Sequence, residues 1–196
     1  MEIDHRIHLC LAKMSPTGAE QKYINEAFAS NWIAPLGPNV DAFERDLEDF
    51  LNSTLKIAAV SSCTAAIHLA LLLLGVGKDD EVICQSFSFC ASSNPVTYCG
   101  AKPIFVDSEE ETWNMSPELL EEAIKDRIAK TGRKPKAIIV VDLYGMPAKW
   151  DDITAISKKY DIPVIEDAAN ALGSYYKGKL CGTFAILQLC RLTATR

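Results

Sequence analysis

Polar and acidic side chains follow two short apolar runs of this chain, at positions where strands of a parallel sheet would end. Residues 162–174 read IPVIEDAANALGS, so Glu166 and Asp167 come directly after a run with the composition of a buried strand. In an open parallel sheet, ligands bind outside the carboxyl ends of the strands. A carboxylate there can meet a cationic group that is partly shielded from water. Asp167 fits that role, and a helix N-cap or a loop acid fits this stretch equally well.

A second polar segment, SSCT at residues 61–64, follows the apolar run at residues 56–60, which we interpret as a strand. It precedes a strong helix pattern at residues 65–74. Hydroxyl groups and free backbone N–H groups at the start of a helix make an anion site. Capping by Ser62 or Thr64 would explain one hydroxyl. Three hydroxyls and a thiol in succession are more than a cap needs, so we favour a phosphate site.

Aromatic side chains lie near the start of the segment QSFSFCASS, residues 85–93, which follows a predicted strand at residues 81–84. Phe87 and Phe89 would usually be core residues, but beside a phosphate site one of them could stack on a flat cofactor ring. Together with a carboxylate for a cationic ring nitrogen, this arrangement suits pyridoxal 5′-phosphate (PLP). The carboxylate would keep the PLP ring protonated, so that the ring accepts electrons from a carbanion.

The rest of the chain alternates between helix patterns and apolar runs. Ser116 is expected as an N-cap, with Pro117 in the first turn of its helix. Helices are expected at residues 20–30, 40–50, 65–74, 117–125 and 151–160, and further strands at 102–107, 136–141 and from 162. Because the strands are continuously apolar, the pattern predicts an α/β protein with a mostly parallel sheet covered on both faces, a three-layer α/β/α fold. The chain has no GxGxxG or P-loop motif.

Composition and charge limit the class of protein. The chain has 196 residues, of which 48% are hydrophobic, and its formal net charge of -6 argues against a general nucleic-acid binder. Seven scattered cysteines without a CxxC pair argue against a zinc site and fit a reducing cytoplasm. We see no secretory signal, and the apolar run at residues 69–74 is too short to span a bilayer. We therefore expect a cytoplasmic protein that binds neither nucleic acid nor a membrane.

From about Ile7 to Phe184, the sequence closely resembles the DegT/DnrJ/EryC1/StrS family, the PLP-dependent aminotransferases of nucleotide sugars. The resemblance rests on blocks in the family's order: NWIAPLGPNVDAFE, SSCTAAIHLAL, DDEVICQSFSFCAS, GAKPIFVD, VVDLYGMP, VIEDAANALGS and YKGKLCGTF. It implies an aspartate-aminotransferase-like large domain (PLP fold type I) at residues 31–184, preceded by an N-terminal segment and helix at residues 1–30. The IAPLG and GTF blocks look most like enzymes that aminate a 4-keto-6-deoxy sugar on a nucleotide such as UDP.

The resemblance also implies roles for five residues. Cys63 and Thr64 would contact the cofactor phosphate, Phe89 would stack on the pyridine ring, and Asp167 would hold the ring nitrogen. Asn170 stands where the family usually has Gln, His or Glu near the cofactor and substrate.

Substrates and partners follow from the same resemblance. Glutamate would donate the amino group to a nucleotide-linked keto sugar, for cell-surface polysaccharide or glycoprotein sugar synthesis. Family members are homodimers in which each site is completed by the neighbouring subunit. Asp142 replaces the common His before the LYG motif, and no role is carried onto it.

The ending AILQLCRLTATR, residues 185–196, departs from the family, which continues after GTF with Gly-Asp, a Ser-Phe pair and the Schiff-base lysine. The ending has no recognisable helix or strand pattern. The ending can be back-translated into codons that, with one G added in front, encode that missing motif in the other reading frame. The lysine of the motif then falls where Arg196 stands. We therefore expect a frameshifted tail, an incomplete large domain, no small C-terminal domain and an inactive truncated chain. A divergent natural tail is the alternative.

Other cationic residues do not replace that lysine in this interpretation. Lys177 and Lys179 are expected in a solvated hairpin, and Arg196 stays protonated. The alternatives to an aminotransferase lineage are a non-catalytic fragment or pseudoenzyme that binds PLP or a full-length partner subunit, and an unrelated doubly wound binding domain. Within the family, dehydratases with His in place of the lysine also stay open.

Overall fold

The computed structural model describes residues 16–51, 56–185 and 187–189. The chain separates into two compact units, and the division along the main part of the chain lies between Ala59 and Val60. The first unit contains two helices, α1 (Ala19–Ala29) and α2 (Pro38–Phe50). The second unit contains the other described helices and strands, and it carries all five residues that the resemblance places at the cofactor.

The predicted strand at residues 56–60 is wrong, because this segment has no regular structure. The backbone N–H of Ile57 donates to a carboxylate oxygen of Glu48 at 3.1 Å, and that of Ala59 donates to Glu44 at 2.7 Å. Both acceptors lie on α2. In a strand, these N–H groups would donate to a neighbouring strand. Here they donate to side chains of the preceding helix instead.

A parallel sheet forms the centre of the second unit. Its strands are β1 (Glu81–Gln85), β2 (Lys102–Val106), β3 (Ala137–Val141), β4 (Val164–Asp167) and β7 (Leu187–Leu189). They run in the order β2-β1-β3-β4-β7, and each neighbouring pair is parallel. The strands predicted at residues 81–84, 102–107, 136–141 and from 162 are confirmed to within a few residues.

β7 lies in the ending at residues 185–196, whose sequence shows no recognisable helix or strand pattern. It pairs with β4 from Ile165 opposite Leu187 to Asp167 opposite Leu189. A short segment can be recruited as a strand by the backbone groups of an adjacent strand, because pairing uses N–H and C=O groups rather than a particular side-chain pattern. Residues 190–196, including Arg196, lie outside the described residues.

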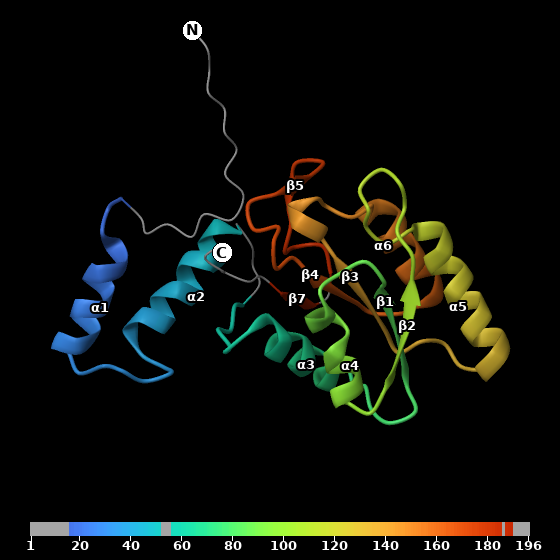
Figure 1. Ribbon diagram of the computed structural model, residues 1–196, viewed down its shortest axis with the longest axis horizontal. Helices are drawn as coiled ribbons and strands as arrows, with labels where there is room; N and C mark the ends of the chain where they lie inside the picture. The colour runs from blue at the N-terminus through green and yellow to red at the C-terminus, as the bar shows by residue number, and fades with distance from the viewer. Residues whose placement is uncertain (1–15, 52–55, 186, 190–196) are drawn as a thin grey trace, which may run out of the picture. The chain divides into compact units, whose positions relative to one another are not determined.

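Helices cover both faces of the sheet (Figure 1), with α3 (Cys63–Leu73) and α4 (Asn94–Tyr98) on one face and α5 (Pro117–Thr131) and α6 (Trp150–Tyr160) on the other. Successive strand residues point to opposite faces. Ile139 accordingly packs with Ile67 and Leu71 of α3, whereas Ile138 packs with Leu120 and Ile124 of α5. These two apolar clusters confirm the three-layer α/β/α prediction.

Shorter elements complete the second unit. They are the 3-10 turns η1 (Cys90–Ser92) and η2 (Leu143–Gly145), and an antiparallel hairpin of β5 (Tyr175–Tyr176) and β6 (Lys179–Leu180). The Ser116 hydroxyl accepts a hydrogen bond from the backbone N–H of Leu119 at 3.2 Å, which confirms the predicted N-cap of α5.

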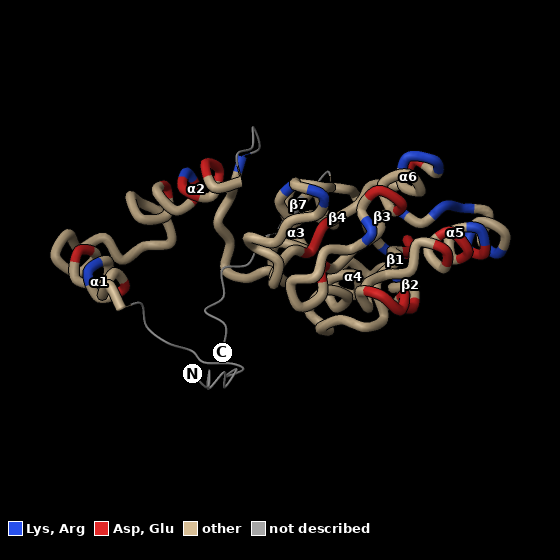
Figure 2. Tube along the Cα trace, turned by 90° about the horizontal axis from the view of Figure 1, so that it is seen from above, with Lys and Arg blue, Asp and Glu red and all other residues tan. Residues whose placement is uncertain are grey.

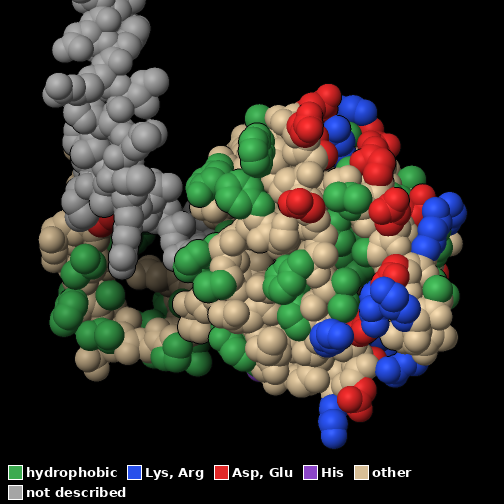
Figure 3. All heavy atoms as spheres, turned by 45° about the vertical axis from the view of Figure 1, so that its right-hand side comes forward, with side chains coloured by type: hydrophobic (Ala, Val, Ile, Leu, Met, Phe, Trp, Pro, Cys, Tyr) green, Lys and Arg blue, Asp and Glu red, His purple; other side chains and the backbone are tan. Residues whose placement is uncertain are grey.

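The two helical layers differ in charge. Figure 2 shows acidic and basic residues along α5 and α6, whereas the sequences of α3 and α4 contain none. In Figure 3, charges of both signs are interspersed on the right-hand part of the visible face of the second unit. The uncharged helices α3 and α4 carry exposed apolar side chains, including Leu72, Leu73 and Tyr98. No described helix combines the length and the apolar composition that crossing a bilayer requires.

Candidate functional site

Asp167 is the last residue of β4, and its side chain is buried at the carboxyl edge of the sheet with 3% exposure. Its Oδ2 accepts a hydrogen bond from the Ser92 hydroxyl at 2.7 Å. Its Oδ1 lies 3.5 Å from the Cys63 sulfur and accepts from the backbone N–H of Ala169 at 3.2 Å. Turns rather than a helix follow β4, so the N-cap alternative for Asp167 is wrong.

The contact between Cys63 and Asp167 brings the first turn of α3 to the tip of β4. Ser62 caps this helix by accepting from the N–H of Ala65 at 3.1 Å, as the capping alternative predicted. The first N–H groups of an α-helix have no acceptor within the helix. Cys63 and Thr64 are the first two residues of α3, so the N-terminal end of this helix lies beside the Asp167 carboxylate.

Phe89 is 70% exposed and directly precedes η1, so the alternative that it is a core residue is wrong. Its carbonyl oxygen accepts from the backbone N–H of Ser92 at 3.0 Å. Because Ser92 also donates to Asp167, the Phe89 backbone is tied to the strand tip through one intervening residue. Phe87 instead contacts Trp113 edge to face, with ring centroids 5.9 Å apart.

Asn170 lies exposed in the turn after β4, three residues beyond Asp167. Its backbone passes close to Gly145, where a Cβ would come within 3.0 Å of the Asn170 carbonyl oxygen. Gly145 also has a φ of +85°, so a side chain at this position would be both strained and crowded. The structure thus joins Cys63 to Asp167 directly and Phe89 through Ser92, and it holds Asn170 on the adjoining turn.

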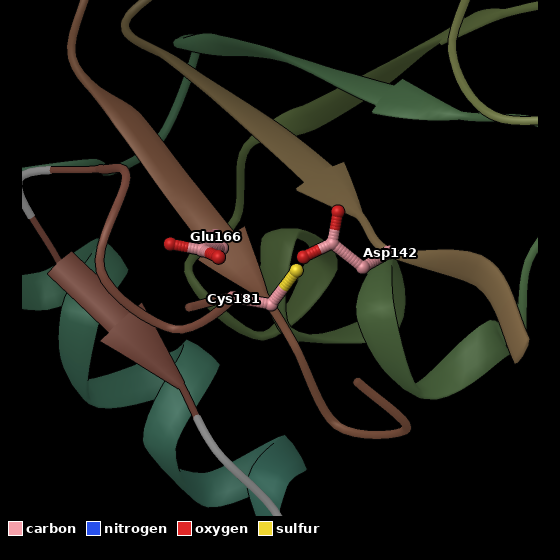
Figure 4. A group of neighbouring side chains, drawn as sticks. All are labelled: Asp142, Glu166 and Cys181. Carbon is pink, nitrogen blue, oxygen red and sulfur yellow. The ribbon is translucent and has the colours of Figure 1, made fainter. Parts of the chain in front are cut away.

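A buried acidic cluster, formed by Asp142, Glu166 and Cys181, lies on the other side of the β3–β4 pair. Figure 4 shows the three side chains converging from the end of β3, from β4 and from the segment after β6. Each offers one possible ligand atom, and these atoms lie within 4.8 Å of one another. All three residues are buried. No motif in the sequence predicted this cluster.

Most of the carboxylate oxygen atoms in this buried acidic cluster accept a hydrogen bond. Asp142 Oδ1 accepts from the backbone N–H of Ala148 at 2.8 Å and from the indole N–H of Trp150 at 3.0 Å. The two Glu166 oxygens accept from the backbone N–H groups of Gly182 and Phe184. Asp142 Oδ2 is buried and has no donor among the residues that the structure describes.

Burial raises the pKa of both carboxyl groups in the cluster. The pKa of Glu166 rises from its ordinary value of 4.5 to about 7, chiefly by desolvation and further by the negative charge of Asp142. Desolvation also raises the pKa of Asp142, against the hydrogen bonds from Ala148 and Trp150, which lower it. One signal was present in the sequence: alternation along β4 places Glu166 on the opposite face from Asp167, where a buried carboxyl group needs partners.

The two lysines near the end of the described chain lie in the β5–β6 hairpin, as predicted. Both are exposed. Lys177 forms an ion pair with Asp151 of α6, and the Lys179 ammonium lies 4.5 Å from the centroid of the Phe184 ring.

Known proteins share this fold and this order of motifs. A protein from Streptococcus pneumoniae that is named provisionally as a sugar aminotransferase, solved in its PLP form, superposes with a TM-score of 0.80 at 32% identity, over 91% of this chain and 47% of that one. The second unit therefore has the α/β architecture of the large domain of PLP-dependent aminotransferases of fold type I. Residues 15–190 match the profile of the DegT/DnrJ/EryC1/StrS aminotransferase family, and the chain belongs to this family.

Two curated relatives are similar over most of this chain. EpsN of Bacillus subtilis, which is named provisionally as a pyridoxal phosphate-dependent aminotransferase, is 54% identical over 179 residues. GDP-perosamine synthase of Escherichia coli O157:H7 is 44% identical over 170 residues. The alignments cover 91% and 87% of this chain, but only 45% and 44% of the relatives. The chain thus spans a little under half the length of the relatives that it matches.

Proposed function

We propose that the carboxyl edge of the sheet binds PLP, with the Asp167 carboxylate at the ring nitrogen and the start of α3 at the phosphate. The observation that carries this proposal is the 3.5 Å contact between Cys63 Sγ and Asp167 Oδ1, which sets an acid beside a helix N-terminus. These two features suit the two charged ends of the cofactor. The residues present therefore fit PLP.

Bound PLP supplies an electron sink, which stabilises negative charge that develops on the carbon bearing the transferred amino group. The Asp167 carboxylate favours the protonated, cationic ring nitrogen by direct charge pairing. Its burial at 3% exposure limits screening by water and so strengthens that pairing. Donors at both of its oxygens orient the carboxylate before any ligand arrives.

The phosphate end is held by a different element. Backbone N–H groups of Cys63 and Thr64 point from the first turn of α3, and the helix dipole adds positive potential there. The exposed ring of Phe89 is available to stack on the pyridine ring. Asn170, on the turn after β4, would face the cofactor edge or the substrate.

The reaction that we propose for the whole protein is amino transfer from glutamate to a nucleotide-linked keto sugar. The family and the name of GDP-perosamine synthase support a nucleotide-sugar substrate. We further propose a cytoplasmic homodimer, for which the uncharged, partly exposed layer of α3 and α4 offers an apolar contact surface. Residues 31–184 would then contribute part of one PLP-binding domain in each subunit.

We also propose that residues 185–196 are read out of frame and that the catalytic lysine belongs to the intact frame. Lys177 and Lys179 lie in an exposed hairpin with contacts of their own, which supports a chain that binds PLP without forming a covalent bond to it. Sequencing the gene tests this proposal. A reading frame that encodes these twelve residues without the alternative motif in the shifted frame would overturn it.

Titration of the 196-residue chain with PLP, followed by protein fluorescence, tests the cofactor site. We expect saturable one-to-one binding that Asp167→Ala weakens at least tenfold. Asp107→Ala is the matched control, because Asp107 is an exposed acid directly after β2, a strand of the same sheet that β1 and β3 separate from β4. Equal loss in both variants, or no saturable binding by the unaltered chain, would contradict the proposed site.

A further inference from the structure

Ser92 contacts Asp167 from η1, and neither the sequence motifs nor the proposed cofactor contacts assign it a role. Its hydroxyl donates to Asp167 Oδ2 at 2.7 Å, and the residue is buried with 7% exposure. Carboxylate oxygens only accept, so the single hydroxyl hydrogen of Ser92 points to Asp167. This short bond to a charged group is of the stronger kind.

A second hydroxyl fixes that direction. Ser88 Oγ lies 3.3 Å from Ser92 Oγ. Since the Ser92 hydrogen is committed to Asp167, Ser88 must be the donor in this pair. The result is a directed chain of hydrogen bonds from Ser88 through Ser92 to the carboxylate, in which each bond polarises the next.

Ser92 also connects two proposed cofactor contacts. Its backbone N–H donates to the Phe89 carbonyl at 3.0 Å, while its side chain donates to Asp167. On the other side of the carboxylate, Cys63 approaches Oδ1 from α3. The acid is therefore held between the helix start proposed for the phosphate and the turn that carries the proposed stacking ring.

We propose that Ser92, supported by Ser88, is a positioning residue that orients the Asp167 carboxylate toward the PLP ring nitrogen and fixes the turn of Phe89 beside it. This inference rests on the proposed function. Removal of the Ser92 hydroxyl would free one buried carboxylate oxygen to rotate and to pair elsewhere. The ring nitrogen would then lose part of the charge pairing that keeps it protonated.

The test compares Ser92→Ala, Ser92→Thr and Ser93→Ala in the 196-residue chain, with PLP labelled by ¹⁵N in the ring as the probe. Ser93 is the matched control, because its hydroxyl donates to the Cys90 carbonyl from the adjacent position. For Ser92→Ala we expect PLP affinity to fall roughly ten- to a hundredfold, the effect of losing a hydrogen bond to a charged group. The ¹⁵N signal should move toward that of neutral pyridine. Ser92→Thr keeps the hydroxyl and should restore both readouts, and Ser93→Ala should leave both unchanged.

Each possible result decides the inference. If the unaltered chain binds PLP and Asp167→Ala weakens binding, but Ser92→Ala behaves as Ser93→Ala does, the role of Ser92 is refuted and the cofactor site stands. An unchanged ¹⁵N signal with equal losses in Ser92→Ala and Ser92→Thr would show that Ser92 acts only through folding. Absence of saturable binding by the unaltered chain would overturn both the site and the inference.

Discussion

Asp142→Asn is the substitution that examines the buried acidic cluster most sharply. The two carboxyl groups have donors at three of their four oxygens, and the fourth, Asp142 Oδ2, has none among the described residues. One proton held between Asp142 and Glu166 would satisfy it and would leave the pair with a single negative charge. An asparagine keeps Oδ1 as an acceptor and places an NH₂ donor at the Oδ2 position.

The expected magnitude follows from the pKa of Glu166, which rises from 4.5 to about 7 in the folded protein. Between these values the folded state holds a proton that the unfolded state has released, so the free energy of unfolding decreases as the pH rises. A shift of this size corresponds to about 3 kcal/mol, since one pKa unit equals about 1.4 kcal/mol. Asp142→Asn supplies the donor without a proton and removes the negative charge of Asp142, so it should reduce this loss, whereas the part of the shift that comes from burial of Glu166 remains.

Urea unfolding between pH 5 and pH 8 measures the effect, with the fluorescence of the buried Trp150 as a local signal, because its indole donates to Asp142. The lowered pKa values of Glu109 and Glu121, both about 2, place their contributions below pH 4.5 and outside this window. The two proteins should be similar at pH 5, and at pH 8 the variant should be more stable by less than about 3 kcal/mol, because only the share of the pKa shift that Asp142 causes is removed.

Glu166→Gln is the counterpart, because both Glu166 oxygens accept backbone N–H groups and an amide would turn its own NH₂ toward one of them. It should destabilise the protein by about 1–3 kcal/mol even at pH 5. Parallel pH profiles for Asp142→Asn and the unaltered chain would refute the shared proton. Destabilisation of the unaltered chain by a chelator would indicate a metal ion in its place.

Two further predictions concern packing and charge in the second unit. Leu71→Ala should lower the free energy of unfolding by about 2–5 kcal/mol and Leu72→Ala by less than about 0.5 kcal/mol, because these neighbours on α3 are 0% and 53% exposed. Urea unfolding measures both values. Similar losses of stability in the two variants would contradict the assigned buried face of α3. Arg127→Ala should lower the free energy of unfolding by about 1–3 kcal/mol, since Arg127 makes two 2.8 Å hydrogen bonds to the mostly buried Glu81. Lys130→Ala removes an exposed ion pair and should lower it by under about 0.5 kcal/mol. Thermal unfolding measures both, and a larger loss in Lys130→Ala would contradict this prediction.

Local patterns predicted most of the second unit. Continuous apolar runs predicted the strands β1 to β4, and the alternation of strands with helices predicted the layers. Ser116 and Pro117 predicted the start of α5, because helix capping and a first-turn proline depend only on residues within one helical turn. Cys63 and Asp167 are 104 residues apart. Their proximity was expected from the rule that strand ends share one edge of a parallel sheet, but the run before Cys63 is not a strand. The family resemblance, which implies that both contact one cofactor, gave the same expectation without that strand.

What the sequence did not predict depends on partners far along the chain. The run at residues 56–60 has the composition of a strand, but its N–H groups bond to Glu44 and Glu48 instead. β7 forms because β4 offers its edge, not because its residues show a strand pattern. Ser92 acquires its proposed role from one side-chain contact with Asp167, which no local periodicity encodes.

A crystal structure of the chain soaked with PLP tests the central claim most directly. The account predicts one Asp167 carboxylate oxygen within hydrogen-bond distance of the ring nitrogen, and the phosphate at the backbone N–H groups of Cys63 and Thr64. PLP bound at another place, or bound here with its phosphate toward Asp167, would contradict the account.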